Sequence, residues 1–532
     1  MKLHTALFAA VLLAAGAGAA MAAPSEPATK NWIVGLRRGA AAEPAPSLRN
    51  RPVRRFQSVD AYAVAMTEQE ANELRSSGDV RYVEPDYPRY LYGGRPVPGP
   101  RRTSWTSAVT ASAPARSATQ SVPYGIDLIR ARTLWQYGRG AGIKVGVIDT
   151  GIDYNHPDLK SIYKGGKDFI NNDADPMDDH GHGTHVAGTI AAANNQIGVV
   201  GVAPEIDLYA LKVLAPKDDG SAQGSVTAIV AAIDFAIENK INVLNLSLGS
   251  DEQSITEKEA FARAWDAGIL SIAASGNGYD DLKRDFIGFP AAYPNVVAVG
   301  AIDKDEGIAS FSQRGAELAL VAPGISVLSS LPVGSGVIAD VAVDDEFLPE
   351  VGTPDGTPMG EASAGFVFCA LGKTGEFPAS VAGKIALIKR GDITFNEKAR
   401  NAKAAGAIGV VIFNHDNTAL NWTLIRNDET GKPIADDLPL TVAISKSEGD
   451  ALVAKPSARV SIAVSPYDYG ILQGTSMATP HVAGVAALVW SLAPESTAAQ
   501  VRNAITTTGR DIGDGGWDTV FGFGVVDALR AA

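Results

Sequence analysis

The architecture of this chain is set by the stretch "IKVGVIDTG", residues 143–151. Its apolar residues form a nearly continuous run that ends at Asp149, which is typical of a buried strand. Further apolar runs follow at residues 207–214, 241–249, 269–277 and 296–302. Helical patterns separate them, at residues 185–193, 225–239 and 257–268. Strands that alternate with helices predict an α/β fold, a doubly wound and mostly parallel sheet with helices on both faces. In such a sheet the active site lies beyond the carboxyl ends of the strands.

The rest of the chain divides into further parts. Residues 31–92 have the strand and helix patterns of a small α+β unit. Residues 93–118 are rich in Pro, Gly, Ser, Arg and Ala without an apolar period, which indicates a linker of the kind that proteases cut. Residues 334–465 interrupt the α/β pattern, so we expect an inserted domain that divides the α/β body into residues 119–333 and 466–532.

The N-terminus has the form of a targeting segment. Residues 1–22 combine an early lysine, an apolar run and a final A-x-A sequence, which predicts a secretory signal peptide. A membrane anchor is the alternative, but the apolar run is short and rich in alanine. No other long apolar run follows, so we expect no membrane anchor and a secreted protein, extracellular or periplasmic. The single cysteine, Cys369, excludes an internal disulfide and leaves stability to packing or to bound ions.

Charge is distributed unevenly along the chain. Residues 23–118 carry a net charge of +5, whereas residues 119–532 carry −19. A linker rich in arginine is one explanation. The pattern also favours a basic segment that docks electrostatically on an acidic body. We expect no nucleic-acid partner.

Three short motifs carry the candidate chemistry. They are "VIDTGID" at residues 147–153, "HGHGTHVAG" at residues 180–188 and "GTSMATPHVAG" at residues 474–484. Alone, the first is commonly a turn, the second could be a metal-ligand cluster, and the third is usually a helix N-cap. Together they supply an aspartate, a histidine and a serine at the ends of separate elements, which nucleophilic catalysis requires. Serine is a weak nucleophile until a histidine takes its proton and a carboxylate orients the imidazole.

These motifs closely resemble the signatures of the subtilisin-like serine proteases, the subtilases, in which the same Asp, His, Ser order occurs. The similarity continues through "NNQIGVVGVAP", "NVLNLSLG", "FPAAYPNVVAVGA" and "GFGVVDA". The resemblance implies Ser476 as nucleophile, His182 as general base and then acid, and Asp149 as orienting carboxylate. It also implies that Asn277, with the backbone N–H of Ser476, donates to the oxyanion. His481 is expected to pack within the fold.

The same resemblance assigns roles to the other parts. Residues 31–92 resemble the inhibitory propeptide of the family, which caps the active site and is cut away. The chain is therefore expected to be a zymogen that processes itself, with its own propeptide as an intramolecular inhibitor. Residues 93–118 would be the processing region. The insert at residues 334–465 resembles a protease-associated (PA) domain, through "GKIALIKRGDITFNEKARNAKAAGAIGVVIFN", and we expect it to be rich in strands.

The resemblance also places a substrate pocket. Its walls would be two segments and its floor a glycine, and the residues are Ser247, Leu248, Gly249, Ala274, Ser275, Gly276 and Gly288. A glycine floor leaves depth, and none of these positions carries a carboxylate. We therefore expect a preference for large apolar side chains at the residue before the cleaved bond.

A structural calcium ion is expected from the loop "NNQIGVV", residues 194–200. The resemblance implies ligands from side chains and from backbone carbonyls, namely Gln120, Asp158 and Asn195, with the carbonyls of Ala193, Ile197 and Val199. All are oxygen ligands, which suit a hard cation. The alternative is that the loop is merely a turn and Asp158 a helix cap.

The sequence thus predicts a secreted serine endopeptidase that acts on protein or peptide substrates. One alternative is a binding protein that kept the fold without the activity. The four residues Asp149, His182, Ser476 and Asn277 argue against it, because a binding role would not require all of them. An esterase of the α/β-hydrolase type is disfavoured, because Ala478 stands where G-x-S-x-G requires its second glycine.

Overall fold

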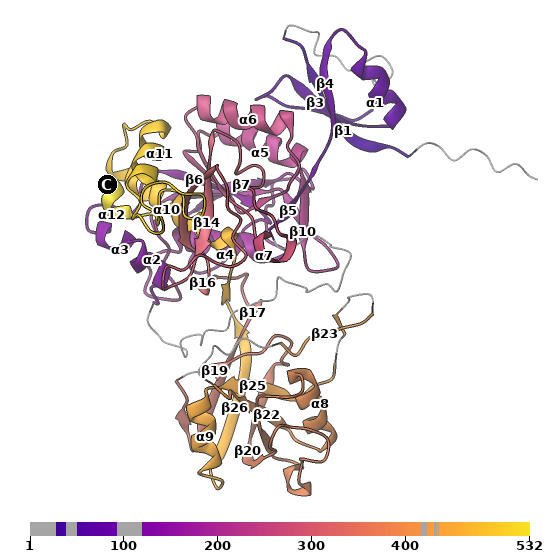
Figure 1. The fold of residues 1–532 in the computed structure, drawn as a ribbon, viewed down its shortest axis with the longest axis vertical. Helices are drawn as coiled ribbons and strands as arrows, with labels where there is room; N and C mark the ends of the chain where they lie inside the picture. Colours follow the sequence, from indigo (N-terminus) through magenta and orange to yellow (C-terminus); the bar gives the residue numbers. More distant parts are fainter. Residues whose placement is uncertain are drawn as a thin grey trace, which may run out of the picture.

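The structure is a computed structural model of the 532-residue chain. It describes residues 28–38, 51–92, 120–349, 351–416, 423–429, 433–434 and 436–532. The expected signal peptide and the expected linker lie outside these ranges. Figure 1 shows three bodies along the long axis of the molecule: a small N-terminal unit, a central α/β body, and the inserted domain at the far end.

The central body is built on a seven-stranded sheet in the order β15-β14-β13-β11-β6-β8-β7, and all its neighbouring strands pair in parallel. The strands are β6 (Lys144–Asp149), β7 (Tyr163–Asp168), β8 (Asp207–Lys212), β11 (Val243–Leu246), β13 (Leu270–Ala274), β14 (Val296–Ile302) and β15 (Leu318–Pro323). The predicted α/β class and doubly wound parallel sheet are confirmed. From β6 the chain passes first to the edge strand β7, returns to β8 beside β6, and then crosses to β11, from which it runs outward to β15, so the strand order changes side between β6 and β11. Ligands bind at such a switch point in parallel sheets.

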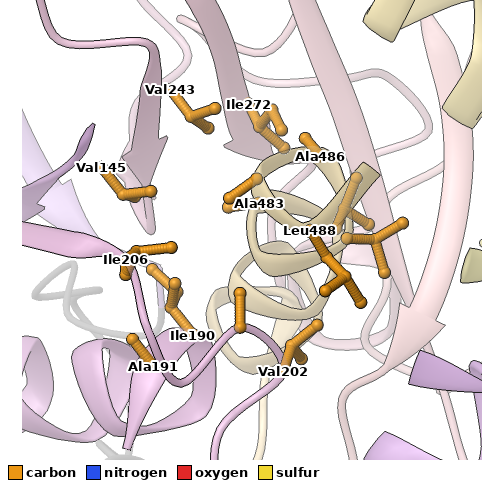
Figure 2. Packing of buried hydrophobic residues seen from close by; sticks show 14 of the residues in the cluster. Val145, Ile190, Ala191, Val202, Ile206, Val243, Ile272, Ala483, Ala486 and Leu488 are labelled. Carbon is orange, nitrogen blue, oxygen red and sulfur yellow. The ribbon is translucent and has the colours of Figure 1, made fainter. Parts of the chain in front are cut away.

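Helices cover both faces of this sheet because successive strand residues point to opposite sides. On one face lie α4 (His182–Ala191) and α10 (Thr475–Leu492), and on the other lie α5 (Val226–Glu238) and α6 (Ile255–Asp266). In Figure 2, Ala483 and Ala486 of α10 lie beside Val243 and Ile272, which belong to β11 and β13. The small residues of α10 let this helix approach the sheet closely. Shorter helices complete the body: α2 (Tyr124–Leu128), α3 (Ala131–Leu134), α7 (Tyr279–Leu282), α11 (Ala498–Thr507) and α12 (Ala528–Ala531).

The N-terminal unit is an antiparallel sheet in the order β2-β3-β1-β4 with one helix. Its elements are β1 (Lys30–Leu36), β2 (Val53–Arg55), β3 (Ala61–Met66), α1 (Glu68–Arg75) and β4 (Val80–Pro85). Buried apolar residues such as Trp32, Val34 and Tyr62 give this unit a core of its own. The chain then continues as β5 (Pro88–Leu91), which leaves the unit and enters the central body (Figure 1).

The inserted domain has an eight-stranded mixed sheet in the order β18-β17-β26-β20-β21-β22-β25-β19. Its strands are β17 (Gly336–Val343), β18 (Glu346–Phe347), β19 (Val351–Gly352), β20 (Gly360–Phe368), β21 (Ile385–Lys389), β22 (Gly409–Phe413), β25 (Leu440–Ile444) and β26 (Arg459–Tyr467). Its other elements are the 3-10 helix η2 (Ala379–Val381), the helices α8 (Phe395–Ala404) and α9 (Lys446–Val453), and the short strands β23 (Arg426–Asn427) and β24 (Pro433–Ile434). The antiparallel pair β16 (Val327–Ser330) and β27 (Tyr469–Leu472) joins it to the body.

Two further features of the described residues concern the cysteine and the helices. Cys369 is buried directly after β20 and forms no disulfide. Among the helices that the structure describes, none combines the length and the apolar character needed to cross a membrane.

Candidate active site

The end of β6 and the start of α4 bring Asp149 and His182 together. His182 Nδ1 lies 2.8 and 3.0 Å from the two carboxylate oxygens of Asp149. Because a carboxylate only accepts, Nδ1 carries the hydrogen, which leaves Nε2 as the basic nitrogen of a neutral ring. Asp149 is fully buried and His182 is 5 % exposed, so little water competes for this bond.

The loop between β6 and α4 is organised by Asp178, which the sequence analysis did not single out. One of its oxygens accepts from Thr150 Oγ1 at 2.9 Å and from the N–H of Gly181 at 2.8 Å. The other accepts from the N–H and the hydroxyl of Thr184, at 2.9 and 2.6 Å. This one buried carboxylate therefore ties the residue after Asp149 to the first turn of the helix that carries His182.

The two histidines on either side of His182 are poor bases. Burial lowers the pKa of His180 to about 4 and that of His185 to about 3, and repulsion from the protonated form of His182 acts in the same direction. His185 is held against the carbonyls of Val327 and Gly470, at 3.0 and 3.2 Å. His481 is fully buried, as expected, with Nδ1 2.8 Å from the Met477 carbonyl.

Ser476 is the second residue of α10, which packs against α4. Its hydroxyl donates to the carbonyl of Ser247 at 3.0 Å, and the Ser247 hydroxyl donates to the Ser476 carbonyl at 2.8 Å. The preceding Gly474 has φ 151°, a conformation that glycine adopts more readily than other residues. A Cβ at this position would lie 3.0 Å from the side-chain nitrogen Nδ2 of Asn277, so glycine also allows the Asn277 side chain to lie close to the backbone here.

The side-chain amide of Asn277 is held with its N–H₂ group toward the carbonyl oxygen of Tyr92. Its Oδ1 accepts from the N–H and the hydroxyl of Thr475, at 2.9 and 2.8 Å. Its Nδ2 then donates to the carbonyl oxygen of Tyr92 at 3.0 Å. Tyr92 follows β5, so this amide holds a carbonyl at the end of the N-terminal unit beside the candidate nucleophile.

Strand β5 lies in the cleft as an extended peptide between two strands of the body, β10 (Ala222–Ser225) and β12 (Leu248–Gly249). It pairs antiparallel with both, and β9 (Leu214–Pro216) completes the four-stranded sheet. Tyr90 stands opposite Gly249, and Leu91 opposite Leu248. Main-chain pairing of this kind holds a peptide in an extended form without regard to its sequence, while pockets for its side chains supply specificity.

The ring of Tyr92 lies against two of the residues that were expected to line a substrate pocket, Gly249 and Gly288. A Cβ added at Gly249 or at Gly288 would overlap the Tyr92 hydroxyl, so these two glycines make the space for the phenol. Gly288 donates its N–H to the carbonyl of Ser275 at 3.1 Å, which joins the floor to the segment Ala274–Gly276. Among the described residues, the buried Tyr92 hydroxyl has no hydrogen-bond partner.

The N-terminal unit is fixed to the body by carboxylates at two helix N-termini. Glu84 accepts from the Ser254 hydroxyl and from the N–H groups of Ile255 and Thr256, at 2.8, 2.9 and 2.9 Å. Asp86 accepts from the N–H of Thr227 at 2.9 Å, in the first turn of α5. The exposed N–H groups and the dipole of a helix start favour negative charge, so both contacts are electrostatically favourable.

The residues expected to hold calcium lie close together. Gln120 Nε2 is 2.6 Å from the Ala193 carbonyl, 3.3 Å from Asn195 Oδ1 and 2.8 Å from the Val199 carbonyl. Three of the expected oxygens thus converge on one atom, and turning the Gln120 amide would direct its oxygen to the same place.

Asp158 and Ile197, two further members of the expected calcium set, contact Asn195, although Ile197 does so through its N–H and not through the expected carbonyl. Asp158 Oδ1 accepts from Asn195 Nδ2 at 2.9 Å, and Ile197 donates its N–H to Asn195 Oδ1 at 3.1 Å. The part of the chain that the structure describes has no group of three His, Cys, Asp or Glu side chains placed to hold a metal. A cation here would rely on amide and carbonyl oxygens with one carboxylate. That donor set fits calcium.

Comparison with known proteins agrees with this geometry. The model of the Subtilase family matches residues 140–350 and 457–524, the PA domain residues 352–452, and Peptidase inhibitor I9 residues 23–92. Subtilisin DY of Bacillus licheniformis is 47 % identical over 214 residues, which span 40 % of this chain and 76 % of that protein. Subtilisin E of Bacillus subtilis (strain 168) is 37 % identical over 325 residues, 59 % of this chain and 77 % of that protein.

A solved structure is similar as well. The psychrophilic subtilisin-like protease Apa1 from the Antarctic psychrotroph Pseudoalteromonas sp. AS-11 superposes with a TM-score of 0.57 at 30 % identity. The match covers 77 % of this chain and 97 % of that protein.

Proposed function

The chain belongs to the subtilase family and is a serine endopeptidase with an inhibitory propeptide, and we propose that Ser476, His182 and Asp149 carry out its chemistry. The hydrogen bond between Asp149 and His182 Nδ1 is the geometric basis of this assignment. It presents Nε2 to accept the proton of the Ser476 hydroxyl.

In the first step Ser476 Oγ bonds to the carbonyl carbon of the substrate while His182 Nε2 takes the hydroxyl proton. To do so, the hydroxyl must give up its hydrogen bond to the Ser247 carbonyl. His182 then passes the proton to the leaving amine as the C–N bond breaks. A water molecule enters by the reverse sequence and frees the acyl group. Asn277 Nδ2 and the Ser476 N–H stabilise the oxyanion, and one such donor is typically worth about 2.7–4 kcal/mol.

One observation supports this function most directly. The Tyr92 carbonyl accepts from Asn277 Nδ2 while β5 pairs with both strands of the cleft, as a peptide substrate would. We propose that the enzyme cuts its own chain between Tyr92 and Gly93. Residues 31–92 would then remain in the cleft as an inhibitor, held by Glu84 and Asp86.

The pocket around Tyr92 supports the expected preference for large apolar residues before the cleaved bond. Ser247–Gly249 and Ala274–Gly276 are its proposed walls, and Gly288 is its proposed floor. The unpartnered Tyr92 hydroxyl favours Phe, Leu or Met at least as much as Tyr, because these leave no buried polar group unsatisfied.

Calcium is proposed as a structural ion. Gln120, Asp158 and Asn195, with the carbonyls of Ala193, Ile197 and Val199, would hold it. The ion would tie the segment at Gln120, which follows the proposed processing region at residues 93–118, to the body. We also propose export through residues 1–22 and the domain division expected from the sequence, with the insert at residues 334–465.

A Ser476→Ala chain tests the proposal. We expect it to remain a full-length precursor, whereas the wild-type chain yields a fragment that ends at Tyr92, as mass spectrometry of both would record. Cleavage of casein and its loss with a serine-directed covalent inhibitor provide the second readout. Equal processing of the mutant with no other protease present would contradict self-cleavage. A processed wild type that leaves casein intact would instead favour the binding-protein alternative.

A further inference from the structure

The cleft contains a charged contact that the proposed mechanism does not use. Arg89 of β5 is fully buried, and its guanidinium pairs with Glu257, which is also fully buried. Arg89 Nε lies 2.9 Å from Glu257 Oε1, and Nη2 lies 2.5 Å from Oε2. The remaining nitrogen donates to Ser250 Oγ at 2.8 Å. Arg89 is three residues before Tyr92, so it is the fourth residue before the proposed cut.

Glu257 is turned away from its ordinary local role. The sequence Ser254–Glu257 fits a capping box, in which the glutamate would reach back to the N–H of Ser254. Ser254 Oγ does accept from the Glu257 N–H at 3.1 Å. The Ser254 N–H, however, donates to the hydroxyl of Tyr293 at 3.0 Å. The carboxylate of Glu257 is thereby released to face the peptide in the cleft.

Glu257 also has favourable contacts within the body. Glu257 lies in the first turn of α6, where the helix dipole favours negative charge. The Tyr293 hydroxyl lies 3.0 Å from its Oε2. Among the ion pairs of the described residues, its only partner is Arg89. When the propeptide leaves, the body therefore retains a pocket with a carboxylate and no countercharge of its own.

We propose that Glu257, Ser250 and Tyr293 form a specificity subsite that selects arginine at the fourth residue before the cleaved bond. The inference rests on the proposed function and on the register of β5, where Arg89 stands opposite Gly224 of β10. A peptide that pairs as β5 does, with the carbonyl of its cleaved bond at Asn277 Nδ2, would place the fourth residue before the cut where Arg89 lies. The pocket fits arginine better than lysine, since a planar fork makes the two parallel bonds to Glu257 and a third to Ser250.

The test uses the processed enzyme made from the full chain. Three chromogenic peptides carry Xaa-Tyr-Leu-Tyr before the leaving group, where Xaa is arginine, its neutral analogue citrulline, or norleucine. We expect kcat/KM for the arginine peptide to exceed that for citrulline by about 10- to 100-fold, the range expected for charge-assisted hydrogen bonds. In Glu257→Gln the ratio should fall to within about threefold of one.

Two more variants test whether the preference for arginine depends on the carboxylate of Glu257. Ser250→Ala keeps the carboxylate and loses one bond, so the ratio should fall by only about two- to fivefold. Glu259→Gln is the matched control, because Glu259 is an exposed acidic residue of the same helix that contacts Arg81; its ratio should equal that of wild type. A wild-type enzyme that cleaves all three peptides with equal kcat/KM overturns the subsite and leaves the protease function intact. Failure to cleave any of them counts against the protease function itself.

Discussion

Replacing Glu84 by glutamine tests how the propeptide is retained after self-cleavage. Glu84 is 7 % exposed and accepts four hydrogen bonds from the first turn of α6, including one from the Thr256 hydroxyl at 2.5 Å. Glutamine has the same shape. It lacks the charge, however, and its side-chain N–H₂ group would face hydroxyl and N–H groups of the body that are themselves donors.

The size of the effect follows from these contacts. Hydrogen bonds to a charged group contribute about 1.5–3 kcal/mol each, and a buried donor left unpaired costs about 1–3 kcal/mol. The favourable position at a helix start adds about 0.3–1 kcal/mol. These terms overlap, so we take about 3 kcal/mol for the whole substitution, which is roughly 150-fold in affinity. The pair between Arg81 and Glu259 is a useful contrast, because its side chains are 45 % and 37 % exposed. An exposed pair contributes about 0–1 kcal/mol, or less than about fivefold.

The assay follows the release of activity. On dilution of the processed complex, active enzyme appears as the propeptide dissociates, and affinity changes at one interface act mostly on this dissociation rate. We expect the rate constant to rise about 100-fold for Glu84→Gln and by less than about fivefold for Glu259→Gln. Mass spectrometry first verifies that each chain has been cut. A Glu84→Gln complex that releases activity within about threefold of the wild-type rate would refute the argument that this buried carboxylate anchors the propeptide.

Three further predictions concern catalysis, calcium and pH. Asn277→Ala should lower kcat by about 10²–10³ with little change in KM, as found when the corresponding donor is removed from subtilisin; a drop under about fivefold would exclude Asn277 from the oxyanion site. A chelator should lower the melting temperature of the inhibitor-blocked mature enzyme, since calcium binds only the folded state. In Gln120→Ala, the difference in melting temperature with and without chelator should be smaller. Equal melting temperatures in the wild type, with no calcium found by elemental analysis, would show that the protein has no structural calcium. Burial lowers the pKa of His481 from 6.5 to about 4, so its contribution to the free energy of unfolding is present above pH 6.5 and is lost as the pH falls toward 4, by up to about 1.4 kcal/mol per pH unit. Denaturant unfolding of Ser476→Ala chains should therefore depend less on pH with His481→Gln added, and an unchanged pH dependence would contradict this.

Much of the protein could be predicted from local patterns. The apolar run ending at Asp149 predicted a buried strand because a parallel sheet covered on both faces needs apolar residues throughout. The motifs around His182 and Ser476 predicted helix starts, and both residues lie in the first turn of a helix. The composition of residues 334–465 distinguished the insert from the α/β body. In each case the pattern that determines the structure lies within a short stretch of neighbouring residues, so it can be recognised in the sequence alone.

The tertiary structure decided which distant residues meet. Arg89 and Glu257 are 168 positions apart, and the sequence around each suggests an ordinary local role: Arg89 lies in a basic segment, and Ser254–Glu257 fits the sequence of a capping box that the structure does not form. The sequence around Tyr92 likewise gives no sign of a special role. Its position near Asn277 follows from the pairing of β5 with β10 and β12. The sequence by itself determined the chemical groups and the elements that carry them. The tertiary structure decided that the buried carboxylate of Glu257 faces Arg89 of β5, because charge pairing and desolvation depend on distance in space and not along the chain.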